Sequence, residues 1–227
     1  MSKSAPRVVC FDLGGVLVRI CRSWEEAIVA AGLPLRDPNL FAAEHTRAQR
    51  YKAVDRYQRG ELETAAYYAE LARATMDVYT TLEVQKIHAA FTLKEYPGAL
   101  ELVRELNQIP NVATACLSNT NAEHWVRLAG EDGRAEYPSV LELRYRVASH
   151  LLGSAKPEPV IFRQAHAVFL SALAESPSQI VFFDDAPENV LAAQHAGWTA
   201  YQIDPHGDTA AQIRSALRAE RVFEGRD

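Results

Sequence analysis

The spacing of apolar and polar residues divides the chain into two regions of different pattern. Residues 7–13, RVVCFDL, form a β-branched and aromatic run followed by two glycines, which predicts a buried strand that opens into a tight turn. From about residue 23 to residue 93, apolar residues instead recur at helical spacing, and we see no strand candidate among them. The helical stretches are 23–33, 40–60, 64–76 and 81–91. We therefore expect a first strand followed by a helical insert.

After Pro97 and Gly98 the pattern alternates between strands and helices. Strands are predicted at 112–118, 145–149, 180–185 and 199–203, and helices at 98–106, from residue 121, at 160–169, at 189–197 and at the C-terminal end. Such alternation favours a parallel sheet whose right-handed crossovers cover both faces. The predicted fold class is therefore α/β, with a doubly wound parallel sheet.

The composition of the chain argues against nucleic acid and membranes as partners. The chain has 227 residues, 48% of them hydrophobic, which is enough to bury the core of one or two compact domains. Its net charge is -5, so it lacks the basic surface that nucleic acid or an anionic membrane attracts, and we expect neither as a partner. The N-terminal apolar run is interrupted by Asp12 and is too short for a membrane span, and we expect no signal peptide. The three cysteines do not suggest a disulfide framework, which favours a cytoplasmic location.

Polar side chains cluster where three of the predicted strands end. Asp12 closes the first strand, Ser118 and Asn119 close the second, and Asp184 and Asp185 close the fourth. Because ligands bind beyond the carboxyl ends of parallel strands, we expect these residues to meet at one site. Buried paired acids are costly without a cation, and carboxylates are ligands that Mg²⁺ prefers. Asp12 and Asp185, together with Asp184, are therefore predicted to hold Mg²⁺.

Each of these residues also has a purely structural explanation. Asp184 and Asp185 suit the cap of the following helix as well as they suit a metal. Ser118 and Asn119 precede a helix, where a hydroxyl and backbone amides hold an anion, but taken alone they are better explained as an N-cap. Lys156 lies in GSAKPEP, where it can point inward at a phosphate, although such a lysine is more often on the surface.

Taken together, four segments resemble the ordered motifs of the haloacid dehalogenase-like hydrolase superfamily: FDLGGVL, CLSNTN, SAKPEP and FFDDAPEN. The resemblance implies that Asp12 is a nucleophile that forms an aspartyl phosphate, and that Ser118 and Lys156 bind the transferred phosphoryl group. It makes Asn119 an additional phosphate donor and places Asn189 where it orients the loop after the metal-binding acids.

The resemblance also implies a domain organisation. Residues 1–20 and 94–227 would form a Rossmann-like core, and residues 21–93 would form a helical cap that closes over the site and selects the substrate. The sequences of the motifs LSNTN and FFDD, and of a QRGEL turn in the cap, are most similar to those of the bacterial group that contains α-D-glucose-1-phosphate phosphatase. We therefore expect a phosphatase of a small phosphorylated metabolite, such as a sugar phosphate, that is a monomer or homodimer.

Gly14 is the departure from the family pattern. Family phosphatases usually carry a second aspartate at this position, which serves as general acid and base. The Mg²⁺ site of Asp12, Asp184 and Asp185 is expected to survive, because the family residue at this position coordinates through its backbone carbonyl, which Gly14 also has. The loss of acid and base catalysis is typically worth about 10²- to 10⁴-fold, so a substrate with a good leaving group, such as a sugar 1-phosphate, is favoured.

Other residues offer a substitute proton donor, and two other functions stay open. Glu123, His124 and His45 are candidate donors, although an ordinary surface position explains each of them more simply. The chain is alternatively a catalytically impaired or binding-only relative that lost its chemistry through Gly14. A 2-haloacid dehalogenase also uses an aspartyl nucleophile, but its resemblance predicts an aromatic residue in the first motif and no metal, so Gly14 and FFDD count against it.

Overall fold

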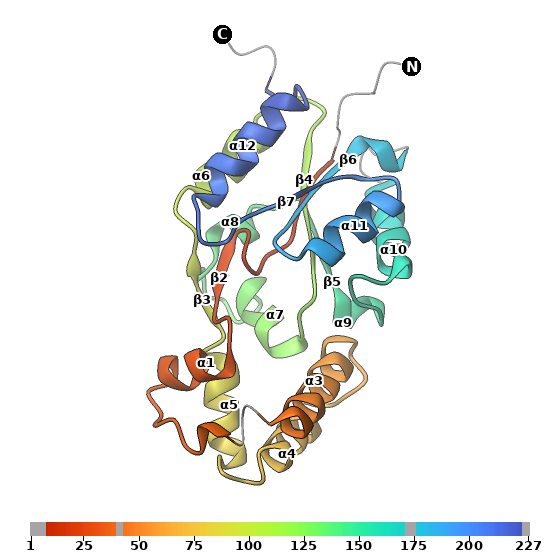
Figure 1. Cartoon of the computed structure of the whole chain (residues 1–227). Helices are drawn as coiled ribbons and strands as arrows, with labels where there is room; N and C mark the ends of the chain where they lie inside the picture. Colours follow the sequence, from red (N-terminus) through yellow and green to blue (C-terminus); the bar gives the residue numbers. More distant parts are fainter. Residues whose placement is uncertain (1–7, 40–42, 171–175, 224–227) are drawn as a thin grey trace.

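A five-stranded parallel sheet forms the centre of the computed structural model, which describes residues 8–39, 43–170 and 176–223 (Figure 1). The strand order is β5-β4-β1-β6-β7. The strands are β1 (Val8–Phe11), β4 (Ala113–Ser118), β5 (Tyr145–Ala148), β6 (Ile180–Asp184) and β7 (Thr199–Gln202). Each predicted strand of the sheet is present, and its neighbours are parallel, so the predicted α/β class is confirmed.

The alternation of side chains in β1 builds a hydrophobic layer on each face of the sheet. Val9 and Phe11 point into one layer, and Val8 and Cys10 point into the other, as the two-residue period of a strand requires. The first layer is covered by α6 (Ala99–Asn107), α7 (Ala122–Leu128), α8 (Pro138–Leu141) and α12 (Thr209–Ala219). The second is covered by α9 (Ser149–Leu152), α10 (Pro159–Leu170) and α11 (Pro187–His195). Because both faces are covered, the three central strands β4, β1 and β6 are buried along their whole length, and Arg146 on the edge strand β5 is exposed.

A helical bundle with its own hydrophobic cluster lies beyond the carboxyl ends of the strands (Figure 1). Its described helices are α1 (Trp24–Ala30), α3 (Glu44–Gln58), α4 (Thr64–Ala74) and α5 (Thr81–Ala89). These match the predicted helical stretches, apart from residues 40–42 of the second stretch, which lie outside the described residues. The cluster buries Tyr67 and Leu71 of α4 against Ile28 and Ile87. The division into a core and a cap at residues 20 and 94 stays a prediction.

Two strands beside the bundle were not predicted, and the second of them begins at Thr92, inside the segment up to residue 93 that was expected to be helical. β2 (Val18–Ile20) and β3 (Thr92–Glu95) pair antiparallel where the chain passes from the sheet to the bundle and back. The sequence of β3, TLKE, does not alternate between apolar and polar residues, and the strand is only partly buried, so it gave no strand signal. It pairs with β2 because the two segments that connect the sheet to the bundle run side by side. The single-turn helices α8 and α9, and the 3₁₀ turn at Pro177–Gln179, were also not predicted, because they are too short to show a period.

The state of the cysteines agrees with the expectation from composition. Cys10, Cys21 and Cys116 are all free and buried, as expected for a chain without a disulfide framework. Within the described ranges, no helix is both long and apolar enough to cross a bilayer.

Candidate active site

The strand order brings the predicted acids together at one edge of the sheet. β1 lies between β4 and β6, and Phe11 is in register with both Cys116 and Phe183. The backbone N–H of Asp12 donates to the carbonyl of Phe183 at 2.8 Å, which carries the pairing one residue beyond β1. One carboxylate oxygen each from Asp12, Asp184 and Asp185 lie within 4.8 Å of one another. The expected convergence of the strand ends is therefore present.

Lys156 joins two of these carboxylates. Its Nζ lies 3.1 Å from Oδ1 of Asp12 and 2.6 Å from Oδ2 of Asp184, and its side chain is completely buried. Burial by itself lowers the pKa of Lys156, but the attraction of Asp12 and Asp184 outweighs this effect and raises the pKa. The lysine therefore supplies a fixed positive charge in the interior and does not extend into solvent.

Asp184 is the acid that holds this lysine in place. Its Oδ1 accepts from the backbone N–H of Ala186 at 2.9 Å, and Nδ2 of Asn189 donates to both of its carboxylate oxygens at 3.0 and 3.1 Å. With the bond from Lys156, its oxygens are largely occupied, and the side chain is completely buried. The N-cap of α11 is Ala186, which receives no side-chain capping bond, so Asp184 does not cap this helix; it holds the turn before α11 and positions Lys156.

Of the two carboxylates that contact Lys156, Asp12 is the one that a ligand can reach. Its side chain is 13% exposed, whereas those of Asp184 and Lys156 are both at 0%. The backbone N–H of Leu13 donates to its Oδ1 at 2.7 Å. Burial is the largest effect on Asp12 and raises its pKa to about 7; Lys156 opposes this rise, and the charges of Asp184 and Asp185 add to it. A divalent cation beside these carboxylates would favour the ionised form of Asp12.

Asp185 approaches the turn after β1 and meets Arg22. Nη1 of Arg22 lies 2.5 Å from Oδ2 of Asp185. Gly15 has φ +80°, and a Cβ at this position would lie 2.4 Å from that same oxygen, so the approach of Asp185 requires glycine here. Arg22 was not singled out from the sequence, because no local pattern signals an ion pair between residues 163 positions apart.

The residues present fit a divalent cation. Three carboxylates face two cationic side chains, Lys156 and Arg22, so the cluster keeps one negative charge in excess. Carboxylate oxygens are the ligands that Mg²⁺ prefers. Gly14, whose backbone carbonyl was predicted as a ligand, lines the same cavity as Asp12 and Asp185.

Ser118 and Asn119, at the end of β4, have different surroundings. Ser118 is buried, at 4% exposure, and lines the cavity beside Asp12. The amide of Asn119 bonds the backbone of Lys156 at both ends: Nδ2 donates to the carbonyl at 2.8 Å, and Oδ1 accepts from the N–H at 2.8 Å. The Asn119 side chain therefore positions Lys156 through Oδ1 and one N–H of Nδ2. The second N–H of the amide is not used in these bonds, so the expectation of an additional phosphate donor stays a prediction.

A cavity of about 680 Å³ separates the carboxylates from the helical bundle. Asp12, Ser118 and Asp185 line it from the sheet side, and Trp24 and Arg50 are among the residues that line it from the bundle. A volume of this size accommodates a small metabolite. The site is therefore a cavity with acidic and basic groups at the sheet edge, and with aromatic and charged side chains of the bundle on the opposite side.

Of the three candidate proton donors, only His124 is among the residues that line the cavity. His124 stacks on His88 with ring centroids 4.0 Å apart, and its ring nitrogens lie 2.8 Å from the carbonyl of His88 and 3.3 Å from Nδ2 of Asn121. Glu123 accepts a hydrogen bond from the hydroxyl of Tyr68, and that hydroxyl also lies 3.0 Å from Nδ1 of His88. These contacts join α4 and α5 of the bundle to α7.

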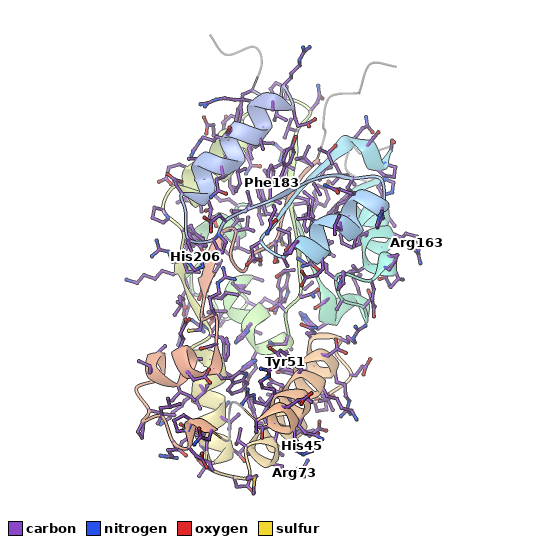
Figure 2. All side chains as sticks on the ribbon, in the orientation of Figure 1. His45, Tyr51, Arg73, Arg163, Phe183 and His206 are labelled. Atoms are coloured by element: carbon purple, nitrogen blue, oxygen red, sulfur yellow. The ribbon has the colours of Figure 1, made fainter. Side chains whose placement is uncertain are left out.

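The third candidate, His45, is exposed on α3 and does not line the cavity. Figure 2 shows it low on the bundle, farther from the sheet than Tyr51. With the ring nitrogens of His124 engaged in the contacts to His88 and Asn121, we assign none of the three candidates to proton transfer.

The stacked histidine pair predicts a loss of stability in acid. Burial lowers the pKa of His124 from 6.5 to about 4 and lowers that of His88 as well. Between pH 6.5 and about 4, His124 is protonated in the unfolded chain but stays neutral in the folded protein. The free energy of unfolding therefore falls as the pH drops through this range. A shift of this size corresponds to about 3 kcal/mol.

Urea unfolding between pH 7.5 and 4.5 measures this effect. We expect a shallower fall in the free energy of unfolding for His124→Gln than for the wild type, while exposed His45→Gln follows the wild type. Because the charge of His124 also lowers the pKa of His88, the difference between the two profiles reports on the stacked pair, and the remaining titrating groups are common to both proteins. Parallel profiles for His124→Gln and wild type would contradict the expectation.

The comparisons with known proteins agree with this geometry. A family model described as haloacid dehalogenase-like hydrolase matches residues 6–197. The chain belongs to the haloacid dehalogenase-like hydrolases. This hydrolase is 25% identical over 223 residues, 93% of its length, to the mouse protein acyl-CoA dehydrogenase family member 10. It is 36% identical over 63 residues, 28% of its length, to phosphatase MT3486 of Mycobacterium tuberculosis (strain CDC 1551 / Oshkosh). The matches span only 19% and 27% of those two proteins.

Among solved structures, the hydrolase is similar to the family enzyme BT-2542 of Bacteroides thetaiotaomicron. The TM-score is 0.72 at 21% identity, over 93% of this chain and 100% of that one. A second structure of BT-2542, in complex with magnesium and inorganic phosphate, gives a TM-score of 0.70 at 22% identity, over 92% of this chain and 100% of that one. At this level of identity the likeness establishes a shared fold.

Proposed function

We propose that this hydrolase is a Mg²⁺-dependent phosphatase of a small phosphorylated metabolite that acts through an aspartyl phosphate on Asp12. The observation that carries the proposal is the position of Lys156, whose Nζ lies 3.1 Å from Asp12 within a cluster of three carboxylates. Phosphoryl transfer depends mainly on positioning and on neutralising charge, and this cluster supplies a reachable carboxylate, a fixed cation and metal ligands.

Each residue of the cluster has a distinct proposed role. Asp12, Asp185 and the backbone carbonyl of Gly14 would hold Mg²⁺, while Asp184, close enough to contribute, chiefly positions Lys156. Bound there, Mg²⁺ would neutralise charge on the phosphoryl oxygens and favour the carboxylate form of Asp12. Asn189 keeps Asp184 oriented through its two hydrogen bonds.

The proposed reaction has two steps. A carboxylate oxygen of Asp12 attacks the phosphorus while Ser118 and Lys156 hold the phosphoryl oxygens, and the bond from phosphorus to the alcohol oxygen breaks. The alcohol leaves and takes a proton from a water molecule in the cavity, because Gly14 offers no acid. Water then attacks the phosphorus of the aspartyl phosphate, which releases inorganic phosphate and restores the Asp12 carboxylate. The helical bundle would act as a cap that excludes bulk water.

Two properties of related proteins support this proposal. The M. tuberculosis relative is named a phosphatase. BT-2542, which shares the fold, has been crystallised with magnesium and inorganic phosphate. A dehalogenase, the other activity in the family's name, is less consistent with a site of three carboxylates whose excess negative charge suits a metal.

The direct test is phosphate release with and without Mg²⁺. We expect the purified protein to release phosphate from α-glucose 1-phosphate and 4-nitrophenyl phosphate with Mg²⁺, and chelation to reduce the rate about a hundredfold or more. Re-addition of Mg²⁺ in excess of the chelator should restore the rate, which separates metal removal from unfolding. No release from any ester in the presence of Mg²⁺ would favour the binding-only alternative.

Gly14→Asp tests whether the missing acid limits the reaction. A Cβ on Gly14 would lie 3.1 Å from Cδ1 of Ile20, so the variant is best made together with Ile20→Val, which removes that methyl group. With an acid restored, kcat for a simple alkyl phosphate should rise by about 10²-fold or more, and kcat for 4-nitrophenyl phosphate, whose leaving group needs little protonation, should rise much less.

Gly14→Asn in the same Ile20→Val background is the matched control, because it has the shape of aspartate but transfers no proton. Equal rates for the Asp and Asn variants on the alkyl ester would show that the missing acid is not limiting. Equal wild-type rates on glycosyl and alkyl phosphates would also count against the leaving-group explanation.

A further inference from the structure

One face of helix α3 lines the cavity on the side opposite the carboxylates. Its lining residues recur at helical spacing: Arg47, Arg50, Tyr51, Val54 and Gln58. Figure 1 places α3 in the bundle and away from the sheet, and Figure 2 labels Tyr51 on the part of the bundle that is nearer to the sheet. A substrate with its phosphoryl group at Asp12 would therefore extend toward this face of α3.

Arg50 is the buried cation of this face. It is 6% exposed, and its Cζ lies 5.4 Å from the centre of the Trp24 ring. Burial lowers the pKa of the Arg50 guanidinium, and the raising effect of Glu25 does not make up for it. The guanidinium remains charged, so an anion that enters the cavity would stabilise a charge that burial disfavours.

The distribution of charge in the cavity differs between its two ends. At the sheet, Lys156 and Arg22 are both within ion-pair distance of the carboxylates of the site. At the bundle, Arg47 lies one turn before Arg50 on α3, and Glu25 is the acid that lines the cavity with them. Among the described lining residues, the bundle end therefore carries an excess of positive charge.

We propose that Arg50, together with Arg47, binds a second anionic group on the alcohol portion of the substrate. This inference rests on the proposed function, because it requires the transferred phosphoryl group to lie at Asp12. The planar guanidinium pairs two oxygens at once, so the group is a carboxylate or a second phosphate. The substrate class is a phosphate monoester whose alcohol carries such an acid, and the cavity of about 680 Å³ has room for it.

Three sugar 1-phosphates that differ only at carbon 6 test this proposal. α-Glucose 1-phosphate has a neutral hydroxymethyl group, α-glucuronic acid 1-phosphate has a carboxylate, and α-glucose 1,6-bisphosphate has a second phosphate. With Mg²⁺, hydrolysis at carbon 1 is followed through the product sugar. We expect kcat/KM for at least one acidic ester to exceed that of α-glucose 1-phosphate by about tenfold or more, equivalent to about 1.4 kcal/mol. The preferred ester identifies the anion.

Charge-removing variants then locate the preference. Arg50→Gln should lower the ratio of kcat/KM between the preferred acidic ester and α-glucose 1-phosphate by about tenfold, and Arg50→Lys should keep part of it. Arg47→Gln should lower the ratio as well, and Arg47 is exposed, so this variant carries the test if Arg50→Gln does not fold. Arg73→Gln is the matched control, because it removes the same charge from an exposed position outside the cavity.

The outcomes separate this inference from the function on which it rests. Equal kcat/KM for the three esters, or no turnover of the acidic esters by a protein that hydrolyses 4-nitrophenyl phosphate, would overturn the anion site and leave the phosphatase intact. A folded Arg50→Gln protein with reduced stability and an unchanged ratio would show that Arg50 is structural, and would also overturn the proposal. The absence of Mg²⁺-dependent release even from 4-nitrophenyl phosphate would overturn the phosphatase itself.

Discussion

Asp12→Asn is expected to reduce phosphate release by about 10⁴-fold or more. The amide keeps the shape of the carboxylate and its Oδ1 can still accept from Leu13 N–H, but it has no charge with which to attack phosphorus. Rates with Mg²⁺, for the wild type and the variant on 4-nitrophenyl phosphate, measure the effect.

The direction of the change in stability caused by Asp12→Asn is also predictable. Burial raises the pKa of Asp12 to about 7, which means that the surroundings disfavour its charge despite the nearby Lys156. The neutral amide should therefore leave the thermal midpoint unchanged or higher. Asp77→Asn is a matched control, because Asp77 is exposed and has φ 56°, a conformation that asparagine tolerates. Activity of Asp12→Asn within about tenfold of wild type would exclude Asp12 as the nucleophile.

Lys156→Met is expected to lower the free energy of unfolding by about 3–5 kcal/mol and to abolish detectable turnover. Methionine fills a similar volume but leaves Asp12 and Asp184 without the cation that lies 3.1 and 2.6 Å from them. Removal of one partner from a buried ion pair leaves an uncompensated charge, which costs more than the pair contributes. Urea unfolding with chelator present measures this loss without a contribution from metal binding.

A double-mutant cycle assigns the loss to the ion pair. Asp184→Asn in the Lys156→Met background should recover a large part of the stability, because it removes the charge that the first change isolated. Lys86→Met, at an exposed position on α5, controls for the general effect of replacing lysine with methionine. If the double variant were as unstable as the sum of the single variants, Lys156 and Asp184 would not be coupled.

Local signals in the sequence were sufficient for the main elements of the sheet. The run VVCF predicts a strand buried on both faces because each of its residues is apolar, and β1 occupies the centre of the sheet. The acids after β1 and β6 converge because adjacent parallel strands end at the same edge. The ribbon of β2 and β3 lacked such a signal, because its partly buried residues alternate too weakly to show a period.

The contacts of the candidate site show what the sequence left open. Asn119 has the same sequence neighbours whether it faces a phosphate or the backbone of Lys156, and only the folded chain brings Lys156 to both ends of its amide. His124 likewise had no partner in the sequence until α5 placed His88 against it.

The sequence alone determined the strands of the central sheet, the longer helices and the residues at the strand ends, because periodicity and strand termination depend on near neighbours along the chain. The tertiary structure decided which of those residues touch. Arg22 and Asp185, which are 163 positions apart, meet only because the segment after β2 and the end of β6 lie side by side. Burial, which raises the pKa of Asp12 and lowers that of Arg50, likewise belongs to the packed molecule, because it depends on what excludes water from each group.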